Sequence, residues 1–406
     1  MIAAARAGTR SVIRVREWEG SAPVRVPEAD LRELLALRPK LDVRPCGDGR
    51  WSVVARSYVG RVCLPSADVE IMPKCPIQNV LELIAYAQRV PELRAGIHES
   101  AAGSLTDLVI AAFAEQLERL VSAGLRRDYR EAADDLVVLR GRLDLERQIR
   151  RPHGARLRLS CRYEDHTLAT PFNAVLRYAL SRAATPWMPL ARRLSALRSR
   201  LEAVPSRPFT PDEIERFHYD RLTEFYAPAH RMCRLVLEGA GVAFEDHGDV
   251  PAGSFLVDMN RVFEGFVARW LAEHLPSPFS VDVQSTHHLD LEGGIPLRPD
   301  VLIRRAGEVI AVVDAKYKVR TNASVSSDDA FQALAYARRF GLRQAWLLFA
   351  DADVRIRAAH TTDGQNAVVT VGLGLTRPWG EVEDTMRRVR DELVRESVET
   401  QANSRS

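Results

Sequence analysis

The stretch Leu297–Lys318, LRPDVLIRRAGEVIAVVDAKYK, constrains the fold more than any other part of the chain. Two short β-branched runs stand on either side of Gly307, a turn residue: Val301–Ile303 and Val309–Val313. This pattern predicts an antiparallel hairpin. If the hairpin is centred on Gly307, Asp300 lies opposite Asp314, so that two carboxylates stand side by side across the strand pair.

Side chains of a strand alternate between the two faces of its sheet, so Lys316 points the same way as Asp314 while Ala315 points away. Like charges opposite each other repel, and the pair of acids therefore has no structural benefit by itself. A divalent cation would reverse the sign of that interaction, and Mg²⁺ is typically held by one or two carboxylates plus substrate phosphate. The alternative is an ordinary surface hairpin that carries an Asp–Lys ion pair.

Lysine usage bears on this choice. The chain has 57 basic residues, of which only four are lysine: Lys40, Lys74, Lys316 and Lys318. Two of the four therefore stand beside the paired acids, where a compact ammonium fits and a wide guanidinium does not. Lys74, in the segment IMPKC, is interpreted as an exposed loop lysine.

Length and composition restrict the class of protein. A chain of 406 residues that is 46% apolar and 27% charged is typical of a soluble protein with two or three domains. Its first residues lack the pattern of a signal peptide and no apolar run is long enough for a membrane span, so we expect a cytoplasmic protein. Five cysteines without C-x-x-C spacing argue against a disulfide framework and a zinc site. No phosphate-binding loop is present, so any step driven by a nucleoside triphosphate requires a partner.

Charge is unevenly distributed along the chain. Between Arg140 and Arg200 there are 14 arginines and only four acidic residues, with aromatic residues among them. Such a basic block is able to contact nucleic-acid phosphates. It is equally typical of solvated helix faces in a chain that favours arginine, and the sequence leaves both interpretations open.

Hydrophobic periodicity predicts an α+β protein with four successive parts. Residues 1–90 are expected to form a β-rich domain, and residues 91–250 a mainly helical middle region that contains the basic block. Residues 251–380 are expected to form a mixed sheet flanked by helices. Residues 381–406 are expected to form a C-terminal helix with a frayed tail.

Two predicted helices add candidate residues to the hairpin. The helix Arg261–Leu275 carries Glu264 at the edge of its apolar stripe, where a glutamate is either a solvated flank or a further metal ligand. The helix Asp328–Phe340 carries Gln332 and Tyr336, which are four residues apart and so share one face. A tyrosine with this spacing is also an ordinary core residue.

The order of helix, strands, helix and strand, together with Glu264, Pro299-Asp300, Asp314-Ala315-Lys316 and Gln332-x-x-x-Tyr336, resembles the RecB-like branch of the PD-(D/E)-x-K nuclease superfamily. Roughly residues 50–350 resemble the McrC family, the nuclease subunits of McrBC modified-cytosine restriction systems. The matching blocks are VEIMPKCPIQNVLELIAYA, VVLRGRLDL, CRYEDHTLATPFNAVLRYAL, VDMNRVFEGFVARWL, DAKYK and AFQALAYA.

The resemblance implies a DNA endonuclease that requires Mg²⁺. Residues 251–380 would have a restriction-endonuclease-like core. In it Asp300, Asp314 and the Ala315 carbonyl would hold the metal, with Glu264 as a further candidate ligand, and Lys316 would position water. Gln332 and Tyr336 would steady the site or the DNA strand. The N-terminal β-rich part would dock onto a hexameric ring of an McrB-like AAA+ GTPase, and that partner would select the modified cytosine.

Two other functions are compatible with part of these features. A non-cleaving adaptor that stimulates an AAA+ NTPase would dock in the same way, but the intact set of Asp300, Asp314 and Lys316 argues against it. A stand-alone RecB-like repair nuclease would use the same residues, but it would not need the long N-terminal half.

Overall fold

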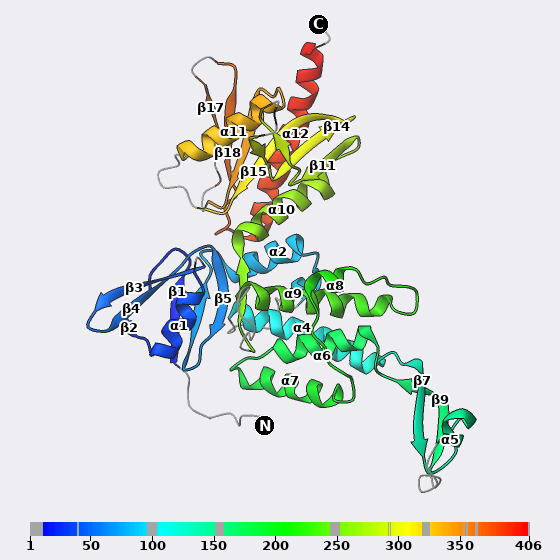
Figure 1. Ribbon diagram of the computed structural model, residues 1–406. Helices are drawn as coiled ribbons and strands as arrows, with labels where there is room; N and C mark the ends of the chain where they lie inside the picture. The colour runs from blue at the N-terminus through cyan, green and yellow to red at the C-terminus, as the bar shows by residue number, and fades with distance from the viewer. Residues whose placement is uncertain are drawn as a thin grey trace. The chain divides into compact units, whose positions relative to one another are not determined.

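The structure is a computed structural model that describes residues 11–38, 40–95, 104–150, 158–243, 252–290, 292, 294–318, 325–351, 354, 356–361 and 364–404. The chain divides into two compact units (Figure 1). Unit 1 comprises residues 1–109 and 239–406, and unit 2 comprises residues 110–238. The fold is α+β, as predicted. No helix among the described residues combines the length and apolar content that crossing a bilayer requires.

The N-terminal part of unit 1 contains two small sheets. Its first sheet has the order β1-β6-β5-β10, and its second has the order β2-β4-β3. The bounds are β1 (Ser11–Arg16), β2 (Val24–Arg25), β3 (Leu41–Gly47), β4 (Arg50–Ala55), β5 (Tyr58–Cys63), β6 (Ala67–Met72) and β10 (Phe255–Asp258). The helices of this part are α1 (Glu28–Ala36), α2 (Ile77–Ala87) and α3 (Glu92–Ala95). Alternating apolar residues of the strands and Leu34 of α1 form one buried core.

Strand β10 was not expected from the sequence. The sequence predicts a domain boundary between residues 250 and 251, which lie outside the described residues, and β10, shortly after that boundary, pairs antiparallel with β5. Gly60 permits this pairing, because its φ is +129° and a Cβ there would overlap the Phe255 carbonyl. The residues on both sides of the expected boundary therefore share a sheet.

The C-terminal part of unit 1 is built on a six-stranded mixed sheet with the order β11-β14-β15-β16-β18-β17. The bounds are β11 (Phe279–Val283), β14 (Val301–Arg305), β15 (Glu308–Lys316), β16 (Gln344–Phe349), β17 (Ile356–His360) and β18 (Ala367–Gly372). A two-residue pair, β12 (His287–His288) with β13 (Pro296–Leu297), lies outside it. Strands β15, β16 and β18 run parallel and are fully buried for most of their length, as expected where both faces are covered.

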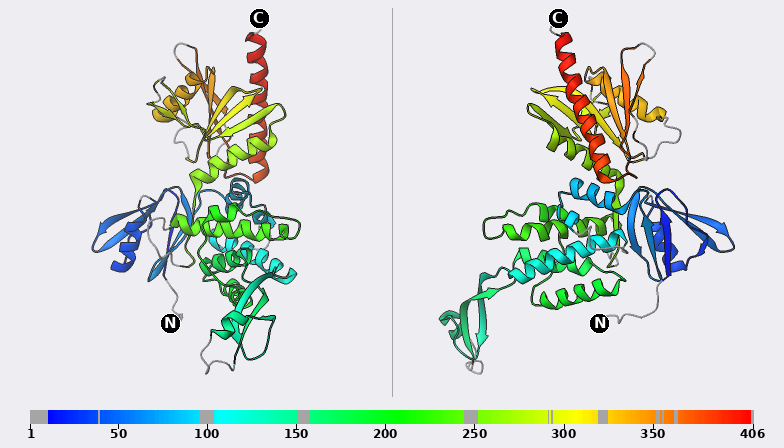
Figure 2. Two further views of the ribbon diagram at one scale, coloured as in Figure 1. Left: turned by 45° about the vertical axis from the view of Figure 1, so that its right-hand side comes forward. Right: turned by 180° about the vertical axis from the view of Figure 1, so that it is seen from behind.

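Three helices cover this sheet: α10 (Met259–His274), α11 (Ser327–Arg339) and α12 (Trp379–Ser404). Helix α11 lies on one face, and α10 and α12 lie on the other (Figure 2). The side chain of Asp258 caps α10 by accepting from Asn260 N, and Ser326 caps α11 by accepting from Asp329 N. Helix α12 continues to Ser404.

Unit 2 combines helices with a three-stranded sheet. Its elements are α4 (Leu105–Ala123), α6 (Pro171–Arg182), α7 (Met188–Arg200), α8 (Pro211–Glu215), η3 (Glu224–Tyr226) and α9 (Ala227–Ala243), of which α4 and α9 cross its boundaries, and the sheet β7-β9-β8 with α5. The bounds of the last group are β7 (Asp128–Leu136), β8 (Arg142–Leu143), α5 (Leu145–Ile149) and β9 (Leu159–Thr167). Strand β7 was missed by the sequence analysis, because its charged residues follow no two-residue apolar alternation.

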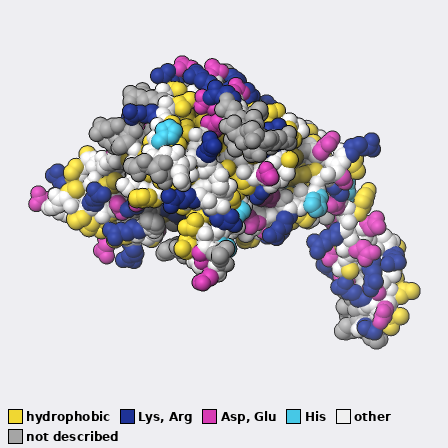
Figure 3. Space-filling view, turned by 90° about the horizontal axis from the view of Figure 1, so that it is seen from above, with side chains coloured by type: hydrophobic (Ala, Val, Ile, Leu, Met, Phe, Trp, Pro, Cys, Tyr) yellow, Lys and Arg dark blue, Asp and Glu magenta, His cyan; other side chains and the backbone are white. Residues whose placement is uncertain are grey.

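Strands β7 and β9 form a long hairpin that extends from the helices of unit 2 (Figure 1). Most arginines of the basic block have partners within the unit. Arg140 pairs with Asp165, Arg162 with Asp144, and Arg193 with Glu118. Figure 3 shows acidic and basic side chains interspersed over this lobe. Much of the block therefore serves internal pairing rather than forming a surface of one charge.

Candidate metal-dependent hydrolytic site

The two predicted carboxylates meet at the end of the β14–β15 hairpin. Val301 pairs with Val313, as the register centred on Gly307 requires, although a bulge shifts the pairing closer to the turn. Asp300 directly precedes β14 and Asp314 lies in β15, so the two side chains interact. The predicted register is confirmed at the end that carries the acids.

Asp300 is held against the backbone of β15. Its Oδ2 accepts a hydrogen bond of 2.8 Å from the Ala315 backbone N–H. The N–H and C=O of a strand residue point to the same edge, so the Ala315 carbonyl also faces the Asp300 side. Two carboxylates and one carbonyl oxygen therefore gather at one place.

A chain of polar contacts leads from these acids to helix α11. Lys316 Nζ lies 2.6 Å from Asp314 Oδ2 and donates to Gln332 Oε1 at 3.0 Å. Gln332 Nε2 donates to the Tyr336 hydroxyl at 2.8 Å, which in turn donates to the Arg298 carbonyl at 3.2 Å. The shared face of Gln332 and Tyr336 therefore looks toward Lys316, and Tyr336 is buried as well.

The second lysine of the motif has a different partner. Lys318 Nζ lies 2.5 Å from Asp329 Oδ2 in the first turn of α11. Among the described lysines, it is Lys316 whose ammonium contacts the paired acids. Lys318 instead ties the end of the strand segment to the start of the helix.

Burial dominates the electrostatics of the two acids. Burial, and next the charge of Asp314, raise the pKa of Asp300 to about 8, against the Ala315 N–H, which lowers it. Burial also raises the pKa of Asp314, although Lys316 opposes the shift. Burial acts to lower the pKa of Lys316, but the surrounding acids, Asp314 first, raise it overall, so its ammonium stays charged.

Glu264 lies on α10, which packs against β15. Burial, followed by the charge of Asp314, raises the pKa of Glu264. Its carboxylate accepts from Gln284 Nε2 at 3.4 Å. Among the described residues, no three His, Cys, Asp or Glu side chains come close enough together to form a metal-binding group. The role of Glu264 as a metal ligand remains a prediction.

The donor set nevertheless fits Mg²⁺. This ion is usually bound through one or two carboxylates, with waters and substrate phosphate completing its octahedral shell. Asp300, Asp314 and the Ala315 carbonyl provide hard oxygen ligands of that kind. Burial raises the pKa values of both acids, and a divalent cation bound between them would lower those pKa values again.

Two residues at the site were missed by the sequence analysis. Gln284 directly follows β11 with φ of +48°, and its backbone N–H donates to the Asp300 carbonyl. Arg298 Nη2 donates to Gln284 Oε1 at 3.1 Å, and its side chain is exposed beside the acids. Arg298 was detectable from its place in Leu297-Arg298-Pro299-Asp300, whereas Gln284 carries no local signal because only tertiary packing brings it to Glu264.

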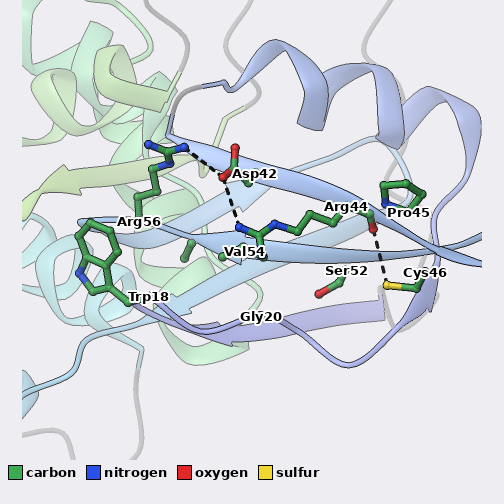
Figure 4. Close-up of a pocket in the computed structure, with 10 residues that line it drawn as sticks. Trp18, Gly20, Asp42, Arg44, Pro45, Cys46, Ser52, Val54 and Arg56 are labelled. Carbon is green, nitrogen blue, oxygen red and sulfur yellow. Dashed lines mark hydrogen bonds and ion pairs between the residues drawn. The ribbon is translucent and has the colours of Figure 1, made fainter. Parts of the chain in front are cut away.

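A separate cavity of about 610 Å³ lies in the N-terminal part of unit 1 (Figure 4). It is lined by exposed Trp18 and by residues of β3 and β4. Its two arginines, Arg44 and Arg56, lie 3.8 and 3.1 Å from the same carboxylate, that of Asp42. The acid of this cavity is paired with two arginines, so the cavity differs in chemistry from the site of Asp300, Asp314 and Lys316.

Comparison with known proteins assigns the chain to a family. Residues 53–350 match the model of the McrBC 5-methylcytosine restriction system component. A search of curated protein sequences gave no match. Among solved structures, one chain of a refined half-complex from the tetradecameric assembly of Thermococcus gammatolerans McrB AAA+ hexamers with bound McrC has 19% sequence identity and a TM-score of 0.68. That match covers 94% of the present chain and all of the other.

A chain from the cryo-EM structure of the Thermococcus gammatolerans McrBC complex has 22% identity and a TM-score of 0.46, over 64% of this chain and 87% of that one. The family match spans well over half of the sequence and includes every candidate site residue, from Glu264 to Tyr336. The chain belongs to the family of McrBC 5-methylcytosine restriction system components.

Proposed function

We propose that this chain is the nuclease subunit of its restriction system and hydrolyses DNA phosphodiesters with Mg²⁺ when an AAA+ GTPase partner activates it. The observation that carries the proposal is the juxtaposition of Asp300, Asp314 and Lys316, in which a half-buried and a buried acid, both with raised pKa values, stand beside a charged lysine. Family membership and the bound McrB hexamers of the similar Thermococcus gammatolerans assembly support it.

Each residue has a role in this proposal. Asp300, Asp314 and the Ala315 carbonyl would hold Mg²⁺, which supplies Lewis acidity and lowers the pKa of bound water. Lys316 offsets negative charge that develops on the phosphate and orients the attacking water. Gln332 accepts from Lys316 and so fixes the direction of its ammonium, while Tyr336 fixes Gln332.

The test is cleavage of methylated DNA by the full chain mixed with its GTPase partner, GTP and Mg²⁺. We expect nicking that EDTA abolishes and that Asp314→Asn removes. Asp282→Asn is a matched control, because Asp282 is an acid of the same sheet that pairs with Arg304 at 2.5 Å. Stimulation of GTP hydrolysis by both variants reports that docking is intact. Undiminished cleavage by Asp314→Asn would overturn the assignment of the site.

If the chain stimulates GTP hydrolysis but neither it nor its variants ever cut DNA, the adaptor function holds instead. If it cuts rapidly with no partner present, it is a stand-alone nuclease. In either case the proposed subunit function fails.

The docking surface requires its own test. The N-terminal part was expected to dock, but several exposed apolar residues lie on the β7–β9 hairpin and its connection: Tyr129, Val137, Val138, Leu139, Leu145 and Ile149. Exposed apolar groups of this kind mark protein contacts. We propose that this hairpin contributes to docking on the partner.

Deleting residues 1–75 is a poor test of docking by the N-terminal part. The deletion would remove β5, which pairs with β10, and would expose the apolar residues of β10 that remain. Point changes discriminate better. Replacing Val137, Val138 and Leu139 by serine should lower stimulation of the partner's GTPase, whereas Leu35→Ser on exposed α1 should not. The opposite result would return docking to the N-terminal part.

A further inference from the structure

Tyr317 directly follows the lysine of the hydrolytic site but serves the opposite face of the sheet. It is 2% exposed and its ring lies 5.9 Å from that of Phe263 in α10. Its hydroxyl donates to Glu17 Oε2 at 3.0 Å, and Lys74 Nζ lies 3.6 Å from the centre of its ring. The same ammonium donates to the Tyr317 carbonyl at 3.4 Å. Tyr317 is thus held through its ring, its hydroxyl and its backbone.

Glu17 and Lys74 both lie at the end of the N-terminal sheet where β1 and β6 stop. Strands β1 and β6 run parallel and therefore end together, and Glu17 and Lys74 follow those two ends. Glu17 N donates to the Met72 carbonyl, and Lys74 N donates to Glu17 Oε2, both at 3.0 Å. The interpretation of Lys74 as an exposed loop lysine is wrong, since it is partly buried among these contacts.

The cluster is costly to bury. Burial raises the pKa of Glu17 to about 7 and lowers that of Lys74. Glu17 Oε1 is buried without a hydrogen-bond partner. Apolar side chains of similar volume would fill this place at lower cost, so packing alone does not account for it. Directional contacts of this kind instead fix one arrangement of the two elements that they join.

We propose that Glu17, Lys74 and Tyr317 are positioning residues through which the N-terminal sheet sets the place of Lys316 in the hydrolytic site. Tyr317 and Lys316 are adjacent on the chain and point to opposite faces. A shift of the N-terminal sheet that moves Tyr317 therefore moves the ammonium that lies 2.6 Å from Asp314. This inference rests on the proposed nuclease function and adds the route by which that site is regulated.

The test uses Tyr317→Phe, which removes one oxygen, and Lys74→Met, which keeps most of the apolar stem. Tyr86→Phe is the matched control, because Tyr86 of α2 also donates to a glutamate, Glu383 of α12, but far along the chain from the site residues. Lys40→Met is the second control, since Lys40 donates to a backbone carbonyl, that of Val242.

We expect partner-stimulated cleavage to fall by about 2- to 30-fold in Tyr317→Phe and Lys74→Met, the range measured for mutations that change coupling between sites. Stimulation of GTP hydrolysis should stay at the wild-type level, and so should cleavage by both controls. In the protein without metal, amide hydrogen exchange at residues 315–317 should become faster in the two test variants alone.

Wild-type cleavage and unchanged exchange in both test variants would overturn the inference. If Lys74→Met fails to fold, Tyr317→Phe and the isosteric Glu17→Gln carry the same test. If the wild-type protein never cuts DNA, the proposed function fails, while the exchange measurement still decides whether Glu17, Lys74 and Tyr317 position the end of β15.

Discussion

The β7–β9 and β14–β15 hairpins place their acidic residues in opposite environments. On the β7–β9 hairpin and its connection, acids have partners at the surface: Arg162 donates to Asp144 and the Tyr163 hydroxyl donates to Asp134, both at 2.7 Å. The N–H of Arg147 and the guanidinium of Arg162 lower the pKa of Asp144. On β14–β15, Asp300 and Asp314 are largely buried beside each other and have raised pKa values.

The difference separates acids that are paired at the surface from acids that burial makes costly to ionise. An exposed acid paired with arginine needs nothing further, whereas two buried acids need a proton or a cation. Net charge along the sequence points to the first hairpin, where arginine is abundant. The close pair of acids with raised pKa values points to the second hairpin, and that hairpin carries the proposed chemistry.

The largest expected effect on cleavage is that of replacing Lys316, compared with replacing Lys318 on the other side of Tyr317. Lys316→Ala should lower cleavage by about 10²- to 10³-fold, because it removes a preorganised charge next to the reacting phosphate. Lys318→Ala, which loses only the pair with Asp329, should keep most of the activity. Nicking rates with partner and GTP measure both. Equal losses would mean that the lysines act through the stability of the strand end.

A smaller effect is expected at Glu264. Glu264→Gln keeps the shape of the side chain but removes a charge felt by Asp314, so cleavage should fall about tenfold, as for outer residues of metal sites. The concentration of Mg²⁺ that gives half the maximal rate should rise in parallel. A wild-type rate with unchanged metal dependence would make Glu264 a solvated flank of α10.

The two hairpins should also differ in how neutralising an acid changes stability. Asp300 has its pKa raised from 3.8 to about 8, so the folded state holds its proton more tightly than the unfolded chain does. Without metal, its contribution to stability is therefore lost as pH rises through this range. Asp300→Asn removes the cost of burying this charge. In EDTA at pH 8.5 it should therefore raise the free energy of unfolding by about 1–2 kcal/mol.

Thermal unfolding with and without Mg²⁺ checks this prediction. Mg²⁺ should stabilise the wild-type protein by mass action and should have little effect on Asp300→Asn. A variant that is less stable than wild type in EDTA at pH 8.5 would show that the acid pair is already compensated within the protein.

The smallest effect is expected for the equivalent change on the other hairpin. Asp144 caps α5 through the Arg147 N–H and pairs with Arg162, so Asp144→Asn should slightly lower stability at neutral pH. Its pKa is lowered, so that contribution is present above the unfolded pKa and disappears as pH falls through the folded one. Opposite signs for Asp300→Asn and Asp144→Asn in the same buffer would confirm the contrast.

Local sequence was sufficient for the site hairpin and the helix that faces it. Alternation of side chains and a glycine turn place Asp300 beside Asp314, and helical periodicity puts Gln332 and Tyr336 on one face. These relations depend on residues close together in the chain, which leaves few alternatives. Proximity of Gln332 to Lys316 followed once the order of helix and strands was recognised.

Tertiary structure alone decided the contacts between distant segments. The pairing of β10 with β5, the meeting of Gln284 with Glu264, and the contact of Tyr317 with Glu17 each join residues with no periodic relation in sequence. Whether a lysine such as Lys74 is exposed or buried depends on which sheet edge packs against it. Sequence periodicity determines which face of an element is apolar, whereas the element that covers that face is chosen by the packing of the whole unit.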